Sequence, residues 1–273
     1  LLTDNFIALT ENRNKSESHL TTLTKMRVVT WACDWEHPSC ESYADGIFQN
    51  WLNNQDNFII PTDVKQSVFC TGLRLNSNNA AAFNAVWNYY KQSNNYADKL
   101  AVIYALGCSQ SETSINYYLS FLISNDNTVR RQDKWIAFRA VVQRQTGIKP
   151  ALNFIVQNYD ALIEKIGKKQ VNSMISTMGS YVSQQSHIDQ INYVISDSTK
   201  QSDLRNSLSA TLSGIQWRKT WAQKYSSQIS TWLNTNTDVG SYSSHLTSSF
   251  VIHTCFLYFL YLYFSSLTEF KNL

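Results

Sequence analysis

Apolar residues recur every three or four positions along most of the chain, a pattern typical of amphipathic α-helices. One stripe joins Phe83, Val86, Trp87 and Tyr90, which stand at positions i, i+3, i+4 and i+7. No stretch alternates apolar and polar residues convincingly with the period of two that a half-buried strand requires. The pattern therefore predicts an all-α fold. Similar stripes lie at 115–122, 152–159, 204–215 and 217–232.

Polar and small residues mark where the predicted helices begin and end. Asn78 or Asn79 can cap the helix that enters the following alanine run, and Ser111 can open the next helix. Gly107 and Gly147 stand where helices are expected to end. These signals give about a dozen short helices with short connections, which bury their stripes by packing on their neighbours. We therefore expect a superhelical stack of short antiparallel helix pairs, a HEAT-like α-solenoid.

The composition changes near the C-terminal end. Residues 1–233 form the predicted helical domain, residues 234–249 read as a polar linker, and residues 250–273 form a tail that begins with a run of apolar and aromatic residues. That run is shorter than the roughly 20 residues of a membrane span. Small residues at 240–244, followed by an apolar run, match the outline of a lipid-anchor signal. The tail is thus predicted as an anchor signal or a membrane segment, with a buried terminal helix or an irregular C-terminus as alternatives.

Charge and composition exclude several classes of protein. The formal net charge is +3, and charged residues make up only 16% of the chain. The longest basic cluster, Lys165–Lys169, is interrupted by Ile-Gly, so no basic stripe for nucleic acid is visible. Three prolines and eight glycines are too few for the many turns of a β-sandwich or barrel.

Cys33 and Cys40 flank a short polar segment within VVTWACDWEHPSCESYADGIFQNWL and admit three interpretations. A zinc site would use both cysteines and His37, but it lacks a nearby fourth ligand. A redox motif would need Cys-x-x-Cys, which is absent here. A disulfide fits best, because Pro38 should break the chain and Ser39 can cap the next helix, so that the two cysteines face each other. Such a ring stabilises the fold by about 2.5 kcal/mol in the loop-entropy model.

Four segments together resemble a known family: KMRVVTWACDWEHPSCESYADGIFQNWL, IPTDVKQSVFCTGL, DKLAVIYALGCSQSE and VRRQDKWIAFRAV. In this order and spacing they are similar to the C-terminal helical domain of aminopeptidase N-type zinc aminopeptidases, with membrane-bound insect gut enzymes closest in texture. The resemblance covers roughly residues 1–233, which we interpret as a domain lacking its N-terminal part. It implies two disulfides, Cys33–Cys40 and Cys70–Cys108. Such bridges and the sequon at Asn14, a predicted glycosylation site, indicate an oxidising, extracellular compartment.

The chemistry of that family depends on motifs that this chain does not contain. Zinc is held by His-Glu-x-x-His with a downstream Glu, and none of the five histidines here stands in that motif. The substrate-amine motif Gly-x-Met-x-Asn is also absent. The resemblance therefore implies no catalytic residue and no metal ligand in this chain, which should be inactive alone. Zinc would lie in the parent catalytic domain, and this part would close the substrate chamber.

Arg130 and Arg131 are the candidates for contacting the C-terminal carboxylate of a peptide, because the resemblance places them near the chamber. The alternative is that they pair with Asp126 or Asp133 at a helix start. The implied partners are the protein's own catalytic domain, peptide substrates, and the membrane through the C-terminal tail, with no nucleic acid. The implied location is the extracellular face of the plasma membrane, with a lipid anchor.

Two other functions stay open at this point. The chain could be a non-catalytic cell-surface binding module, for example a receptor for bacterial pore-forming toxins, a role that insect relatives have. It could also be a scaffold-type solenoid without enzymatic ancestry, but that would leave the paired cysteines and the order of the motifs unexplained.

Overall fold

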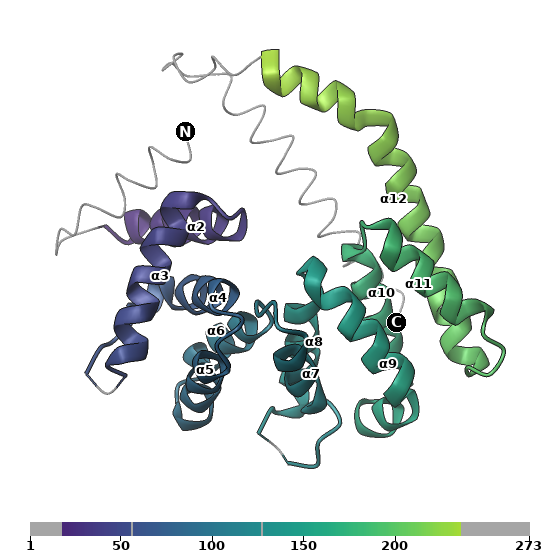
Figure 1. The fold of residues 1–273 in the computed structure, drawn as a ribbon, viewed down its shortest axis with the longest axis horizontal. Coiled ribbons are helices and arrows are strands. Elements are labelled where there is room, and N and C mark those ends of the chain that lie inside the picture. The colour runs from purple at the N-terminus through teal and green to yellow at the C-terminus, as the bar shows by residue number, and fades with distance from the viewer. Residues whose placement is uncertain (1–17, 56, 127, 236–273) are drawn as a thin grey trace. The chain divides into compact units, whose positions relative to one another are not determined.

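The computed structural model describes residues 18–55, 57–126 and 128–235, which contain eleven α-helices, two short 3₁₀ turns and no strand (Figure 1). The prediction of an all-α fold is confirmed. The helices are α2 (His19–Asp34), α3 (Pro38–Asn53), α4 (Lys65–Leu75), α5 (Ala80–Gln92), α6 (Tyr96–Leu106), α7 (Glu112–Ser120), α8 (Lys134–Val142), α9 (Gln145–Ile166), α10 (Lys168–Tyr181), α11 (Gln185–Ser196) and α12 (Ser202–Thr235); the 3₁₀ turns are η1 (Thr62–Val64) and η2 (Arg131–Asp133).

The chain divides into two units, Leu1–Lys224 and Tyr225–Leu273, with the division inside α12. Of the second unit, the described part is the end of that helix, up to Thr235. The predicted tail at 250–273, most of the predicted linker and the sequon at Asn14 lie outside the described residues. The domain boundary at 233 therefore stays a prediction.

Within the first unit the helices form two rows. Among the even-numbered helices, α2 contacts α4, α4 contacts α6, α6 contacts α8 and α8 contacts α10, while α3 packs on α4, α5 on α6, and α9 on both α8 and α10. Figure 1 shows these helices following one another in chain order. Short helices cannot hold their shape alone in water, so each depends on the neighbours that cover its apolar stripe. The superhelical, HEAT-like part of the prediction is not settled by these contacts and stays a prediction.

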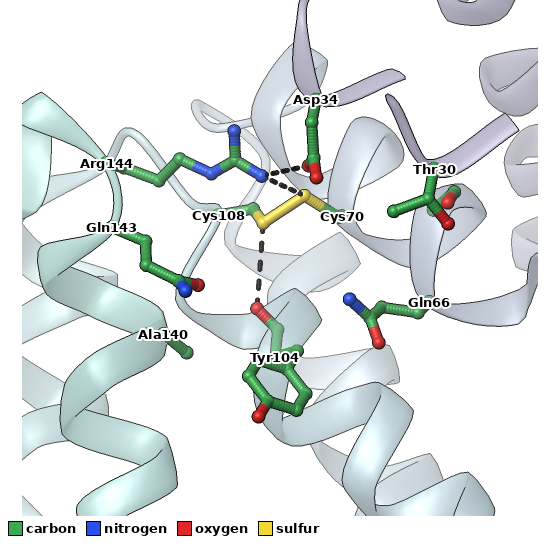
Figure 2. A pocket seen from close by; sticks show the side chains of 10 residues that line it. Thr30, Asp34, Gln66, Cys70, Tyr104, Cys108, Ala140, Gln143 and Arg144 are labelled. Carbon is green, nitrogen blue, oxygen red and sulfur yellow. Dashed lines mark hydrogen bonds and ion pairs between the residues drawn. A yellow bond between two sulfur atoms is a disulfide. The ribbon is translucent and has the colours of Figure 1, made fainter. Parts of the chain in front are cut away.

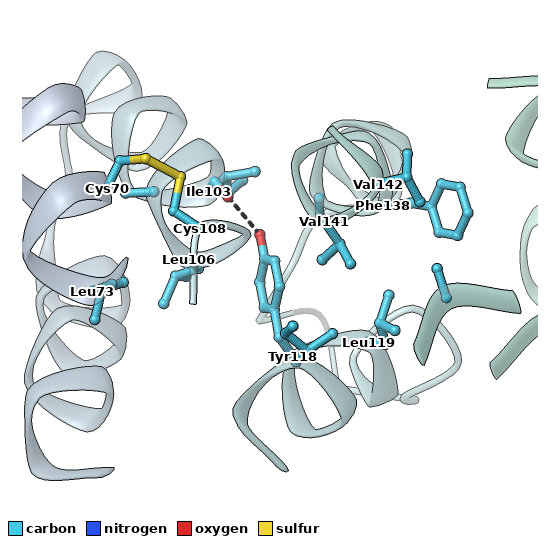
Figure 3. Packing of buried hydrophobic residues seen from close by; sticks show 14 of the residues in the cluster. Cys70, Leu73, Ile103, Leu106, Cys108, Tyr118, Leu119, Phe138, Val141 and Val142 are labelled. Atoms are coloured by element: carbon cyan, nitrogen blue, oxygen red, sulfur yellow. Dashed lines mark hydrogen bonds between the residues drawn. A yellow bond between two sulfur atoms is a disulfide. The ribbon is translucent and has the colours of Figure 1, made fainter. Parts of the chain in front are cut away.

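The apolar stripes read from the sequence form the core. Leu106 of α6, Leu119 of α7 and Val141 of α8 are all buried and belong to one core cluster (Figure 3). Tyr118 is also buried, and its hydroxyl donates to the carbonyl oxygen of Ile103 at 2.9 Å. Burial raises the pKa of Tyr118 well above its usual 10.0, so the phenol keeps the proton that it donates.

One stripe departs from this expectation. Leu204, Leu208 and Ile215 of α12 are buried, but Trp217 on the same helix is 62% exposed. The spacing of the apolar residues predicted that Trp217 belongs to a buried stripe. Spacing cannot show whether another helix packs on that stripe.

Several helix boundaries were predicted correctly. The side chain of Asn79 accepts hydrogen bonds from the backbone N–H groups of Ala81 and Ala82 at 3.0 and 3.2 Å, and so caps α5. Ser111 caps α7 in the same way. Gly107 follows the last residue of α6, as its position in the sequence indicated.

Gly147 does not end a helix, contrary to the sequence prediction. It lies in the first turn of α9, and the preceding helix ends earlier, at Val142. A Cβ atom built on Gly147 would lie 2.1 Å from the carbonyl oxygen of Val141. Glycine is needed here because α9 begins directly against the end of α8, which leaves no room for a side chain.

The start of α3 also differs from the prediction that Ser39 caps it. The helix begins at Pro38, and the cap is His37, whose Nδ1 accepts a hydrogen bond from the backbone N–H of Ser39 at 3.3 Å. Proline suits this first position because the N–H that it lacks would have no partner within the helix. His37 is therefore a structural residue of the bend.

A buried polar cluster links three helices. Lys65 of α4 donates to Asp98 of α6 at 2.7 Å and to Tyr89 of α5 at 2.9 Å, and Tyr89 donates to Asp98 at 2.9 Å. Burial alone would lower the pKa of Lys65, but these partners outweigh it and raise the pKa above 10.5. A lysine whose pKa is higher in the folded protein than in the unfolded chain stabilises the fold at pH values below its unfolded-state pKa. That stabilisation is lost only as the pH rises through the folded-state pKa. The cluster is therefore intact at neutral pH.

We predict that Gly72→Ala destabilises the contact between α3 and α4. A Cβ atom on Gly72 would lie 2.1 Å from Cγ of Phe48, whose ring is fully buried and cannot move aside. Overpacking of this kind should lower the free energy of unfolding by about 1–3 kcal/mol, measured by urea unfolding of the full chain followed by helical circular dichroism.

Gly46 provides the matched control, because it lies in α3 and a Cβ atom added to it would have nothing within 4 Å. Gly46→Ala should raise the free energy of unfolding by about 0.5–1 kcal/mol through helix propensity alone. Equal effects of the two substitutions would contradict the close packing of α3 on α4.

Candidate functional site

Both predicted disulfides are present. Cys33–Cys40 joins the end of α2 to the start of α3. Cys70–Cys108 joins α4 to the second residue after the end of α6. In each disulfide the two Cα atoms are 5.2 Å apart. The sulfurs that the alternative zinc site would use as thiolates are thus bonded to each other. His37, its third proposed ligand, has the capping role described above.

Metal-binding and membrane-spanning features are absent from the part of the chain that the structure describes. Among those residues, no group of three or more His, Cys, Asp or Glu side chains is placed to hold a metal ion. Among the helices of the same residues, none combines the length and the apolar character needed to cross a membrane.

Arg130 is engaged by its neighbours. Its Nε atom donates to Oδ2 of Asp133 at 2.7 Å, and its guanidinium lies 4.5 Å from the centre of the Tyr96 ring. Asp133 is 1% exposed. The pair with Asp133 is the arrangement that we considered as the alternative to substrate contact. It fixes η2, the turn from which the neighbouring Arg131 projects.

Arg131 lies elsewhere, at the edge of a hollow of about 440 Å³ that we call the cationic hollow. Arg131 is exposed, and no carboxylate in the described part of the chain forms an ion pair with it. The hollow is formed by η2, the start of α8, the end of α9 and α10. Its lining residues are Arg131, Gln132, Lys134, Trp135, Ile166, Gln170 and Met174.

Lys134 brings a second cation to this hollow. The residue is 7% exposed, and its ammonium donates to the carbonyl oxygens of Leu122 and Ser124 at 3.0 and 3.3 Å. Burial lowers the pKa of Lys134 below its usual 10.5; Asp126 opposes this, and the charges of Lys165 and Arg131 add to it. The ammonium is therefore a largely desolvated cation whose described hydrogen bonds go to backbone carbonyls.

The remaining lining residues favour the same kind of ligand. The indole N–H of Trp135 is buried without a hydrogen-bond partner among the described residues. Gln132 and Gln170 add polar side chains, and none of the described lining residues is acidic. Two cationic lining residues and the absence of an acidic side chain among the described lining residues make this hollow suited to an anion such as a carboxylate.

A second, smaller site lies between α2, α4, α6 and the end of α8, and we call it the disulfide cavity (Figure 2). Its volume is about 40 Å³, enough for about three water molecules. Cys70 and Cys108 line it, and Arg144 and Asp34 form an ion pair across it at 2.6 Å. It is too small for a peptide, so the cationic hollow is the candidate substrate-contact site.

Sequence reasoning found Arg131 but missed most of its surroundings. Lys134 stood three positions away in RRQDK and could have been noticed as part of a basic cluster. Gln170 comes from a different helix, and nothing in its local sequence points to the hollow. The pair of Asp34 and Arg144 joins residues 110 positions apart, which no local pattern reveals.

Comparison with known families decides what kind of domain this is. The family model described as the ERAP1-like C-terminal domain matches residues 1–216. The chain belongs to this family. The resemblance to aminopeptidase C-terminal domains that was read from the sequence is thereby confirmed.

Individual relatives agree with the family. The chain is 29% identical to membrane alanyl aminopeptidase of Manduca sexta over a stretch that covers 52% of this chain and 14% of the relative. It is 24% identical to human aminopeptidase Q over 87% of its length and 23% identical to aminopeptidase N of Plutella xylostella over 82%. Those stretches are 23% and 24% of the two relatives. The chain thus spans about a quarter or less of the proteins that it matches.

Proposed function

We propose that this chain is the C-terminal domain of a membrane-associated zinc aminopeptidase, an enzyme that removes N-terminal residues from peptides. In this proposal the domain closes the substrate chamber and carries no catalytic residue, while zinc and the reacting groups belong to the catalytic part of the protein. The family match and the aminopeptidase relatives support the proposal. The observation that carries the role of this chain is the cationic hollow.

The chemistry of the hollow suits the end of a peptide that an aminopeptidase does not cut. A peptide held for removal of its first residue still carries a carboxylate at its other end. Arg131 offers a planar guanidinium that can bind both carboxylate oxygens at once, and Lys134 adds a buried positive charge behind it. The volume of about 440 Å³ is within the usual range of ligand pockets, about 300–1,000 Å³.

Arg131 is the better candidate of the two arginines that the sequence indicated. Arg130 already has a carboxylate partner in Asp133 and an aromatic partner in Tyr96. In this proposal it acts as a positioning residue, because it holds the turn that presents Arg131.

Replacing Arg131 with alanine in the intact protein tests this assignment. For peptides with a free C-terminal carboxylate, KM should rise about ten-fold with kcat nearly unchanged, because a charge-assisted interaction made equally in the ground and transition states is lost. For the same peptides with an amidated C-terminus, KM should not change. Steady-state kinetics on matched free and amidated peptides provide the measurement.

Arg27→Ala is the matched control, since Arg27 is an exposed arginine on α2, away from the hollow. It should leave both series of peptides unaffected. If Arg131→Ala changed the kinetics of free and amidated peptides equally, the carboxylate contact would be wrong.

We also propose that the protein lies on the extracellular face of the plasma membrane and is held there by a lipid anchor. Two disulfides suit an oxidising compartment, and one relative bears the name membrane alanyl aminopeptidase. The apolar run at 250–264, with small residues at 240–244 before it, supports the anchor.

The anchor predicts release by an enzyme. When the complete coding sequence is expressed in animal cells, phosphatidylinositol-specific phospholipase should release the protein into the medium. If the protein instead stayed on the cells after this treatment and left only when residues 250–273 were deleted, the tail would be a membrane segment. Secretion with the tail intact would contradict both forms of attachment.

A further inference from the structure

The two sulfurs of the Cys70–Cys108 disulfide lie in opposite electrostatic surroundings. An Nη2 donor of Arg144 points at Sγ of Cys70 from 3.4 Å, while Sγ of Cys108 lies 3.6 Å from the carbonyl oxygen of Tyr104 (Figure 2). A guanidinium stabilises negative charge on the sulfur beside it, and a carbonyl oxygen disfavours that charge. Asp34 pairs with the same Nη2 atom at 2.6 Å and offsets part of this charge, but no described cation donates to Sγ of Cys108. The bridge is therefore polarised, with Cys70 as the sulfur better able to carry charge.

The other disulfide lacks this polarity. Sγ of Cys33 lies 3.8 Å from the carbonyl oxygen of Cys40, and Sγ of Cys40 lies 3.5 Å from that of Val29. No described guanidinium or ammonium donates to either sulfur. All four cysteines are buried, but Cys33 and Cys40 line neither of the two cavities described above. The chain thus offers an internal comparison between a polarised and an unpolarised bridge.

We propose that Cys70–Cys108 is a modification site for low-molecular-weight thiols, with Cys70 leaving as a thiolate and Cys108 carrying the mixed disulfide. Both sulfurs line the disulfide cavity, which has room for the thiol group of a reagent but not for the whole molecule, whereas neither sulfur of the other bridge lines one of the two cavities. Exchange is faster when the leaving sulfur has the lower thiol pKa, and it depends on which of the two sulfurs is attacked.

The reagent thiol first loses its proton to solvent. Its thiolate then attacks Sγ of Cys108, and a new S–S bond forms as the bond between Cys108 and Cys70 breaks. The bonding electron pair leaves on Sγ of Cys70, facing Arg144. A second reagent thiol can attack the mixed disulfide, release Cys108 as a thiolate and leave as the oxidised reagent. In total, two thiols supply the two electrons that reduce the bridge.

The opened state has a charge arrangement that the closed state lacks. Arg144 pairs with Asp34 at 2.6 Å in the oxidised protein, and after exchange it would also face the thiolate of Cys70. At the same time the covalent link between α4 and the end of α6 is lost. Opening therefore loosens the contact of α4 with the end of α6, beside the ion pair of Arg144 and Asp34.

Reduced glutathione serves as the probe, applied in graded amounts to the oxidised full-length chain at neutral pH. Acid quenching, alkylation and peptide mapping then report which sulfurs are free, bridged or glutathionylated. We expect Cys70–Cys108 to open at least about ten-fold faster than Cys33–Cys40, with glutathione on Cys108 and a free thiol on Cys70.

Substitutions at Arg144 separate charge from access. Arg144→Gln should slow the opening of Cys70–Cys108 about ten-fold and remove the preference for Cys108, whereas Arg144→Lys should keep most of both. Arg139→Gln is the matched control: it removes an arginine from the same helix region, but that guanidinium lies over the Trp135 ring, 5.5 Å from its centre, instead of beside a sulfur.

Three results would overturn the proposal. One is glutathione found mainly on Cys70 of the unsubstituted chain. Another is opening of Cys33–Cys40 first or at the same rate. The third is an equal rate in the unsubstituted chain and in Arg144→Gln. The first two are read on the unsubstituted chain, so the test does not depend on how a variant folds.

Discussion

The close packing of α8 against its neighbours is the constraint on which both sites depend. A Cβ atom on Gly107 would lie 2.4 Å from the backbone of Ala140, and one on Gly147 would lie 2.1 Å from the carbonyl oxygen of Val141. Glycine at both positions lets the end of α6 and the start of α9 approach α8 directly. The start of α8 then forms part of the cationic hollow, and its end, with Arg144, forms part of the disulfide cavity.

This packing also supports the role that we propose for the domain within an aminopeptidase. Arg130, held by Asp133, fixes the turn before α8, and that turn leaves Arg131 without an ionic partner in the described structure. An exposed cation without an ionic partner among the described residues, in a hollow that the buried Lys134 also lines, is suited to a ligand that arrives with its own negative charge. The proposed role of the domain is to position such a ligand while the chemistry occurs elsewhere.

Local patterns in the sequence predicted the helices well because each apolar stripe is a property of one segment. The caps at Asn79 and Ser111 were predicted for the same reason. Gly147 was assigned to a helix end because its local signal is the same as that of a terminating glycine, while the actual cause is contact with Val141 of another helix. Trp217 shows the converse, since its spacing fits a buried stripe but its side chain is exposed.

The site was predictable only in part. The two disulfides were expected from the family resemblance, and Cys33–Cys40 also from the bend between those residues, and both are present. Arg131 was a candidate by position and lines the hollow, while its contact with substrate stays a proposal. The burial of Lys134, and its lack of an acidic partner, depend on how α8 is packed in three dimensions. The contact of Arg144 with Asp34 depends on the same packing across a long sequence separation. Such features have no local signature.

The role proposed for the domain requires that the C-terminus of a bound peptide lies in the cationic hollow. The most direct test is photo-cross-linking of the intact protein with a peptide that carries a photoreactive side chain next to its free C-terminal carboxylate. We expect adducts on η2 and α10, at residues such as Gln132 and Gln170, and their loss when the C-terminus is amidated. Adducts confined to other parts of the protein, or equal labelling by the amidated peptide, would contradict this role.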